Sequence, residues 1–415
     1  MNRLFADVRE LADRIGPRGT GTPAERAAAD FVAGRLEALG LPVSRREFSA
    51  TYSQNAFPLA SAVLALVAVA VYPLGGAAGR WVAAGLALAA APLLWRAIRL
   101  STNALRPLLP RVSSGNVVAL AEPRRRPARR VVLLAHLDTN RARLAWRSGA
   151  VRWLEPMTWL TLAMLGLLGL LYTIGAVAGS LAQAGGGSAW VWPASLLPAA
   201  YALGMLVTLL RDERTPFSPG AHDNAASVAV ALETARGLAR RPLETTEVRL
   251  AFTGAEETDH AGLYALLRDD PEALREAAFI GLEGLGSGCL VYLTRQGLCD
   301  HVRPDPGLLA VVETVAARRP DLMAGPREMT EEDEVTTLIR RGRRAICLAG
   351  CDPLTETLPR WHRSDDTADS VSLEFLQRAA GFVRAILDEL DGAERRADQE
   401  GVRAGVRKEL TCLPS

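Results

Sequence analysis

Cysteine is scarce in this sequence of 415 residues. Its five cysteines form neither the dense framework of a disulfide-stabilised secreted domain nor the paired spacing of a thiolate zinc site. They are Cys289, Cys299, Cys347, Cys351 and Cys412. We therefore expect reduced thiols in a cytosolic domain.

An excess of charge of one sign is also missing. Lysine and arginine total 48 against 46 aspartate and glutamate residues, which gives a formal net charge of +2. No long-range field would attract nucleic acid, so we expect no nucleic-acid partner. The start of the chain, Met1 to Ile15, is charged and amphipathic and lacks the apolar core of a signal peptide. We expect this segment to form a helix that stays in the cytoplasm.

Charged residues are absent from two long stretches, Phe48 to Gly79 and Pro156 to Leu210. A membrane span needs about 20 mainly apolar residues. Phe57 to Gly76 supplies one such run, and Gly75 to Trp95 supplies a second that contains Arg80. Pro156 to Leu210 supplies two more, separated by a turn at Gly185 to Gly187. We predict two transmembrane helical hairpins, residues 57–97 and 154–210, with the lipid bilayer as a partner; the alternative is four buried helices of a soluble protein.

The arginines around these stretches predict their orientation. Only Arg80 lies near a hairpin tip, whereas the side facing the rest of the chain is rich in arginine. The arginines on that side are Arg45, Arg46, Arg96, Arg99, Arg106, Arg111, Arg141, Arg143, Arg147, Arg152, Arg211 and Arg214. By the positive-inside tendency we expect an integral protein of the cell membrane whose soluble part faces the cytoplasm.

The remaining segments, residues 1–50, 112–152 and 213–415, alternate between helix and strand patterns, which predicts one discontinuous α/β domain with a mostly parallel sheet. A helix should begin after Thr22, since Thr22 and Glu25 have the spacing of a capping box, and end at Gly40. Apolar runs predict strands at Val131 to Ala135, Val248 to Phe252, Ala277 to Leu282 and Ala345 to Leu348.

Polar residues follow these strands where each strand ends, which is where open α/β sheets carry their sites. A two-zinc hydrolase needs nitrogen and oxygen ligands on each ion, a bridging carboxylate and a separate carboxylate as base. A lone histidine is more often structural, and an Asp-Asn pair before a helix is more often a cap. Their joint occurrence favours a metal site: His136 and Asp138, Asp223 and Asn224, Glu256 and Glu257, Glu283, and His362 with Asp365 and Asp366.

The ordered motifs AHLDT, PGAHDN, FTGAEE, FIGLEG and WHRSDDT resemble metallopeptidase family 28, the co-catalytic zinc aminopeptidases of the aminopeptidase Y type. The opening run IGPRGTGTPAERAAADFVAGRLEALGL is also similar to that family. The resemblance covers the whole chain outside the two hairpins. It implies a zinc exopeptidase-like three-layer fold, interrupted here by two transmembrane hairpins.

Two zinc ions and a peptide substrate are also implied by the resemblance. His136 and His362 would bind one ion each, Asp223 would bridge both, and Glu257 and Glu283 would complete the ligand set. Glu256 would be the general base, and Asp138 would orient the imidazole of His136. Asp366 stands where the family has an aspartate four residues after its last histidine.

Three features depart from the family pattern. Glu283 replaces the usual aspartate ligand, Trp361 stands where some members have an oxyanion-stabilising tyrosine, and the hairpins are additional. His222 is expected to be structural or on the surface, His260 and His301 have no ligand partner, and Asp333 belongs to an acidic run that is left outside the site.

We therefore expect a membrane-anchored zinc exopeptidase, an aminopeptidase by preference. Two alternatives stay open: a single-zinc acyltransferase resembling glutaminyl cyclases, and an inactive receptor or scaffold of the same fold. The sequence predicts neither the peptide that is cleaved nor the oligomeric state.

Overall fold

The computed structural model describes residues 2–99, 109–146, 149–181 and 190–411. Four features of the sequence, the turn at Gly185 to Gly187, Arg106, Arg147 and Cys412, lie outside the described residues. The four described cysteines are free thiols, as expected.

An eight-stranded sheet forms the centre of the α/β domain, in the order β1-β2-β4-β3-β5-β8-β6-β7. The central strands β4, β3, β5 and β8 are parallel to one another, while β1, β2 and β6 run antiparallel to neighbours. The strands are β1 (Val43–Thr51), β2 (Arg111–Ala121), β3 (Arg129–His136), β4 (Thr246–Thr253), β5 (Ala278–Glu283), β6 (Cys289–Gln296), β7 (Ala324–Met329) and β8 (Arg344–Cys351). The mostly parallel sheet is confirmed, and the four predicted strands are its central four. The other four strands were missed; β1 and β7 are largely exposed or polar, so they lack the continuous apolar run of the central strands.

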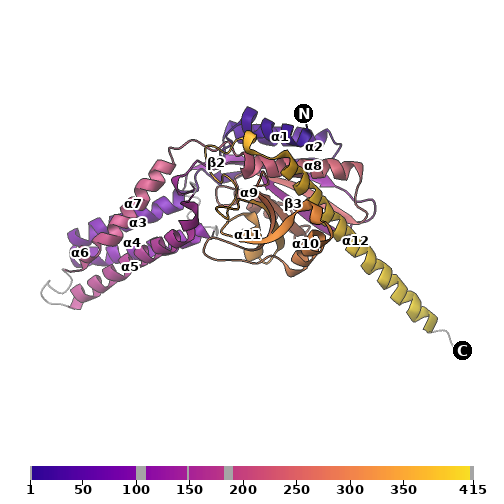
Figure 1. The fold of residues 1–415 in the computed structure, drawn as a ribbon. Coiled ribbons are helices and arrows are strands. Elements are labelled where there is room, and N and C mark those ends of the chain that lie inside the picture. Colours follow the sequence, from indigo (N-terminus) through magenta and orange to yellow (C-terminus); the bar gives the residue numbers. More distant parts are fainter. Residues whose placement is uncertain (1, 100–108, 147–148, 182–189, 412–415) are drawn as a thin grey trace.

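Helices cover both faces of this sheet (Figure 1). Alternate residues of β3 explain why, since Leu133 packs with one helical layer and Leu134 with the other. The first layer contains α1 (Arg3–Arg9), α2 (Pro23–Glu37), α8 (Ser227–Arg240), α10 (Pro306–Arg318) and the start of α12 (Leu373–Thr411). The second layer contains α9 (Ala261–Asp269) and α11 (Glu334–Arg340). The predicted three-layer architecture is therefore confirmed.

A separate bundle of apolar helices projects from one end of the domain (Figure 1). Its helices are α3 (Ala56–Leu74), α4 (Gly76–Ile98), α5 (Leu154–Leu181), the short α6 (Val191–Ala194) and α7 (Leu196–Asp212). Three helical segments, Ala56–Leu74, Gly76–Ile98 and Val151–Leu181, are long and apolar enough to cross a membrane. The fourth, α7, is the shortest at 17 residues, because the chain breaks from α6 into α7 at Ser195.

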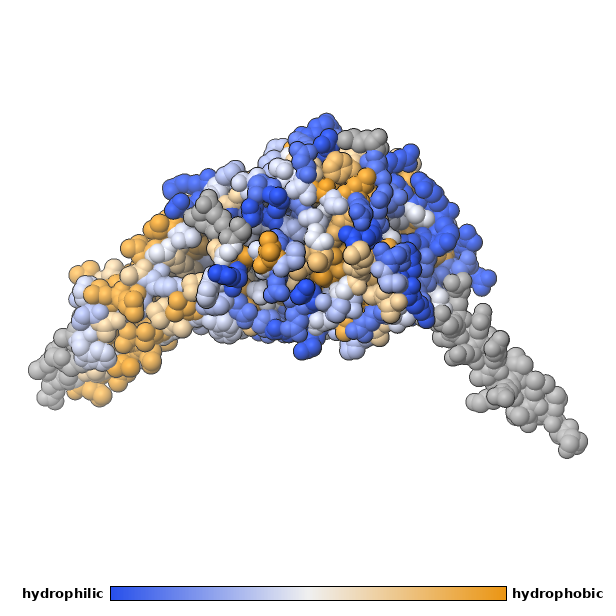
Figure 2. Space-filling model, in the orientation of Figure 1, coloured by the Kyte–Doolittle hydropathy of each residue, from blue (hydrophilic) through white to orange (hydrophobic). Residues whose placement is uncertain are grey.

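The bundle has its small residues inside and its large apolar residues outside. Alanines such as Ala65, Ala68, Ala84 and Ala87 are buried between the helices. Among the described residues, almost all exposed large apolar side chains lie on the bundle, and Figure 2 shows this surface in orange beside the hydrophilic domain. Close packing on small residues with an apolar exterior is typical of helices surrounded by lipid.

The predicted capping box at the start of α2 forms only in part. The Thr22 side chain accepts a hydrogen bond from the Glu25 amide, as expected. The Glu25 carboxylate, however, accepts hydrogen bonds from the Gly21 and Ala255 amides and from the Ser114 hydroxyl. The buried Glu25 side chain therefore connects α2 to the loop after β4, and it does not complete the capping box by accepting from the Thr22 amide.

Candidate metal centre

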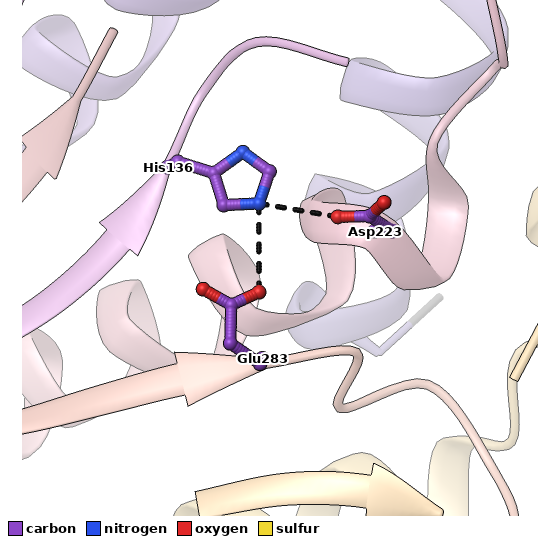
Figure 3. A group of neighbouring side chains, drawn as sticks. All are labelled: His136, Asp223 and Glu283. Carbon is purple, nitrogen blue, oxygen red and sulfur yellow. Dashed lines mark ion pairs between the residues drawn. The ribbon is translucent and has the colours of Figure 1, made fainter. Parts of the chain in front are cut away.

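The first half of the site lies where two neighbouring parallel strands end. His136 is the last residue of β3 and Glu283 is the last residue of β5, so both side chains reach the same edge of the sheet. Figure 3 shows them converging with Asp223. The Nε2 atom of His136 lies 3.1 Å from Asp223 Oδ1 and 3.5 Å from Glu283 Oε2.

The second half uses the other oxygen of the same aspartate. His362 Nε2 lies 3.3 Å from Asp223 Oδ2 and 3.2 Å from Glu257 Oε2. Asp223 therefore faces one histidine with each of its carboxylate oxygens. This is the arrangement that a bridging ligand requires.

Glu256 lies beside the two groups of candidate ligands that share Asp223. Its Oε2 lies 4.0 Å from His136 Nε2, and its Oε1 lies 3.1 Å from His260 Nε2. The Nδ1 atom of His260 is in turn 2.9 Å from the Thr337 hydroxyl. His260 therefore contacts the candidate base, which sequence spacing did not indicate.

Asp138 is buried beneath the turn that carries both glutamates. Its carboxylate accepts hydrogen bonds from the amides of Glu256 and Glu257 and from the Thr20 hydroxyl. The contact to His136 comes from the backbone carbonyl of Asp138, 3.0 Å from Nδ1, whereas the nearest carboxylate oxygen is 3.7 Å away. Asp138 therefore positions the imidazole through its main chain and the glutamate turn through its side chain.

Asp366 organises the loop of the bridging aspartate. Its carboxylate accepts hydrogen bonds from the His222 and Asp223 amides, and it lies 2.7 Å from His222 Nδ1. His222 is completely buried between Asp366 and the Ser287 hydroxyl, so it does not lie on the surface. Asn224 donates to the Leu282 carbonyl, so it ties the loop to the end of β5 and does not cap α8.

The acidic run before α11 is buried beside the site, contrary to the expectation of a solvated cap. Glu331 and Asp333 are each 2 % exposed. Asp333 does cap α11, through Thr336. Oxygens of Glu331 and Asp333 also gather near the Cys347 sulfur, within 4.8 Å of one another. Sequence alone could not indicate this, because an acidic run on a helix start is usually hydrated.

Negative charge dominates the electrostatics of the site. Burial opposes protonation of His136, but the carboxylates of Glu256 and Glu283 raise the pKa of His136 well above its ordinary value. Burial also raises the pKa of Glu283 to about 7, although His136 opposes this shift. The pKa of Glu256 is raised well above its usual range by burial, with Glu257 and Glu283 adding repulsion. A cluster of carboxylates that raises these values is a site suited to cations.

The donor set fits two zinc ions. Imidazole nitrogen and carboxylate oxygen are zinc ligands, and two groups share Asp223: His136 with Glu283, and His362 with Glu257. Glu257 Oε1 is buried without a hydrogen-bond partner, as expected for an oxygen kept for a metal. All five predicted ligands are therefore brought together.

The site opens into a cavity of about 350 Å³. The predicted ligands line it together with Glu256, Trp361 and the missed residues His260, Glu331 and Asp333. Residues of all four long apolar helices line it too: Pro58 on α3, Leu94, Ala97 and Ile98 on α4, Leu154, Met157, Thr158 and Thr161 on α5, and Met205, Thr208, Leu209 and Asp212 on α7.

Polar residues between the bundle and the α/β domain contact two of the candidate metal ligands, Glu257 and His362. The Asn140 amide donates to Glu257 Oε2 at 2.6 Å and to Gln54 Oε1 at 2.9 Å. Arg143 donates to the Asn55 side chain, and its backbone amide donates to the His362 carbonyl. Gln54 and Asn55 directly precede α3, so the first hairpin is connected to the candidate metal ligands.

Residues 211–387 match the model of peptidase family M28. Endoplasmic reticulum metallopeptidase 1 of Rattus norvegicus is 30 % identical over 193 residues, which is 45 % of this chain and 21 % of that protein. The Mus musculus protein of the same name is 29 % identical over 192 residues, with the same coverage. This chain thus spans about a fifth of the length of these curated relatives.

Solved structures share the fold at low identity. A zinc aminopeptidase from Bacillus subtilis has a TM-score of 0.53 and 16 % identity, covering 94 % of each chain. Porphyromonas gingivalis glutaminyl cyclase has a TM-score of 0.54 and 15 % identity, covering 93 % of this chain and 97 % of its own. These likenesses support the zinc exopeptidase-like fold, which hydrolases and cyclases share.

Proposed function

From the match of residues 211–387 to the model of peptidase family M28, we propose that the chain is a membrane-anchored, two-zinc exopeptidase that removes N-terminal residues from peptides. The observation that carries the proposal is the position of Asp223, with one oxygen 3.1 Å from His136 and the other 3.3 Å from His362. A single-metal enzyme has no need of a carboxylate shared in this way.

When bound, the two zinc ions would polarise the scissile carbonyl and acidify the attacking water. His136, Glu283 and Asp223 would hold one ion, and His362, Glu257 and Asp223 the other. The proton transfers are assigned to Glu256, whose Oε1 lies 3.1 Å from His260 Nε2 and whose Oε2 lies 4.0 Å from His136 Nε2. Glu256 takes the proton of the water and delivers it to the leaving amine.

A cyclase is the second candidate because glutaminyl cyclases have the same fold at the same level of similarity. Metal content distinguishes the candidates. Purified full-length protein, equilibrated with zinc and measured by mass spectrometry, should contain about two ions per chain and hydrolyse an aminoacyl arylamide. One ion with cyclisation of an N-terminal glutamine would favour the cyclase. No bound zinc and no turnover would favour the scaffold.

We also propose that the α/β domain faces the cytoplasm. Arg96, Arg99, Arg152 and Arg211 lie at the domain ends of the apolar helices, whereas Arg80 lies at the far end. The exposed thiol of Cys289 provides a test, because the other described cysteines are buried. In a Cys412→Ser background, a membrane-impermeant maleimide should label inside-out vesicles and leave sealed right-side-out vesicles unlabelled. The opposite labelling pattern would reverse the orientation.

A further inference from the structure

One cavity joins the candidate metal centre to the apolar helices. The zinc-binding residues and Glu256 line it on the side of the sheet, and α3, α4, α5 and α7 line it on the side of the bundle. The contacting residues lie at the domain ends of these helices, from Leu154 to Thr161 on α5 and from Met205 to Asp212 on α7. The hairpins therefore form a wall of the site as well as anchoring it.

This helical wall is apolar despite its threonines. The hydroxyls of Thr158, Thr161 and Thr208 each donate to a carbonyl four residues earlier on their own helix, which leaves methyl groups for contact. Met157 and Met205 add flexible thioether side chains that adapt to apolar groups of different shape. Of the described lining residues on the helices, Asp212 alone is charged, and it interacts with Arg143.

We propose that this wall, called here the apolar chamber (Leu94, Ala97, Met157, Thr158, Thr161, Met205 and Thr208), binds apolar side chains next to the scissile bond. The preferred substrates are then peptides with hydrophobic N-terminal residues, which also partition to a bilayer surface. This inference rests on the proposed peptidase function, because it assumes that the polar end of the cavity holds the peptide bond.

The size of the cavity restricts the occupant. Its volume of about 350 Å³ is near the lower end of ligand sites, which span roughly 300–1,000 Å³. A short segment with one or two large side chains fits this volume, and a folded protein chain does not. A charged N-terminal side chain would lose its hydration against α4, α5 and α7, where the one charged lining residue, Asp212, already interacts with Arg143.

Binding can be measured separately from turnover. The probes are two fluorescent peptides of equal length and charge that begin with Leu-Leu or Ser-Ser. They are titrated onto zinc-loaded, full-length Glu256→Gln protein in nanodiscs, with empty nanodiscs as a blank for partitioning. We expect the leucine peptide to bind about tenfold more tightly or better, which is the scale of apolar side-chain discrimination.

The chamber is tested by Met157→Asn in the same background, with Thr208→Asn as a second variant should the first not fold. The matched control is Leu170→Asn, on the same helix and similarly exposed (55 %, against 45 % for Met157) but outside the cavity. Met157→Asn should reduce the preference for leucine several-fold, and Leu170→Asn should leave it unchanged. Equal binding of the two peptides, or an equal loss in both variants, would overturn the proposal.

Wild-type turnover of the same peptides separates the two proposals. Hydrolysis of both peptides with equal kcat/KM and equal binding would refute the chamber and leave the peptidase intact. Preferential binding of the leucine peptide without hydrolysis of either would refute the peptidase and support the chamber as a binding site.

Discussion

At the scale of single residues, the site depends on carboxylates with different tasks at similar positions. Glu256 and Glu257 are adjacent in sequence, yet one contacts His260 and the other contacts His362. The backbone between them is fixed by Asp138, which accepts both amides. Their different environments explain how neighbouring glutamates can serve as base and as ligand.

Removal of the base should separate chemistry from metal binding. Glu256→Gln should retain two zinc ions, because Glu256 is outside the proposed ligand set, and lose about 10²–10⁴-fold in kcat. Turnover and metal content are measured on the same sample, with Glu272→Gln as a control on an exposed surface. A near-normal rate in Glu256→Gln would remove Glu256 from the mechanism.

Glu283, at the end of β5, should bind zinc although its side chain is one methylene longer than the usual aspartate. Glu283→Asp should keep two ions with altered activity, since aspartate is also a zinc ligand but one methylene shorter. Glu283→Ala should lose one ion or much of its affinity. The measurement is zinc titration against a chelating dye, and an unchanged stoichiometry and affinity in Glu283→Ala would show that other groups hold the metal.

At the scale of elements, the loops that carry ligands are held by buried polar contacts between distant segments. The loop of Asp223 is tied by Asp366, and the loop after β4 is tied by Asp138 and Glu25. Removal of one side of such a buried hydrogen bond costs free energy, because the remaining donor or acceptor is left without any partner, protein or water. Each loop therefore depends on an element far away in the sequence.

Loss of the Asp366 contact should weaken metal binding without removing a ligand. Asp366→Ala should lower zinc affinity about 10–100-fold, the usual effect of removing a group that orients a metal ligand. Asp365→Ala is the matched control, because Asp365 is adjacent but pairs with Arg360 and Arg363 on the surface. Equal zinc affinity in the two variants would contradict this positioning role.

Glu25 should give stability a particular pH dependence. Burial raises the pKa of Glu25 from 4.5 to about 8, with Asp138 adding to the shift. The folded state thus holds the proton of the Glu25 carboxyl more tightly than the unfolded state does. Protonation of Glu25 therefore contributes fully to the free energy of unfolding below pH 4.5, and this contribution is lost as the pH rises to about 8.

The comparison is with Glu25→Gln, which cannot titrate, and with Glu37→Gln on the exposed part of the same helix. Glu25→Gln should be less stable than wild type at low pH. The glutamine side chain has only one acceptor oxygen, so it cannot accept hydrogen bonds from both the Gly21 and Ala255 backbone amides. The difference in apparent Tm between wild type and Glu25→Gln should then narrow between pH 5 and 8. A difference that stays constant or widens would show that Glu25 is ionised throughout.

At the scale of the whole molecule, the α/β domain and the apolar bundle meet at the cavity of the candidate metal centre. All proposed ligands come from the domain, and the bundle contributes the opposite wall. The bundle therefore supplies lining residues of the cavity in addition to helices long enough to cross a membrane. Anchoring and substrate binding can both depend on the same helices.

Replacement of both hairpins tests how far the two parts are independent. With residues 57–97 and 154–210 each replaced by a short Gly/Ser linker, the domain should still bind two zinc ions and hydrolyse an alanyl arylamide. It should lose the preference for hydrophobic N-terminal residues, because the apolar wall is gone. A folded protein without zinc would mean that the bundle helps to build the metal centre through Gln54, Asn55 and Arg143.

The sequence by itself predicted the central strands, the apolar helices and, through its resemblance to metallopeptidase family 28, the five candidate ligands. Strand periodicity predicts His136 and Glu283 at strand ends, and uncharged length predicts the hairpins; both are local signals. Tertiary structure decided the rest. Only packing shows that Asp223 offers one oxygen to each histidine, that Asp366 holds its loop, that Glu331 and Asp333 are buried, and that Met157 and Met205 face the metal cavity. These facts depend on contacts between segments far apart in the chain, and burial of an acidic residue is a property of its neighbours in space, which local sequence patterns do not encode.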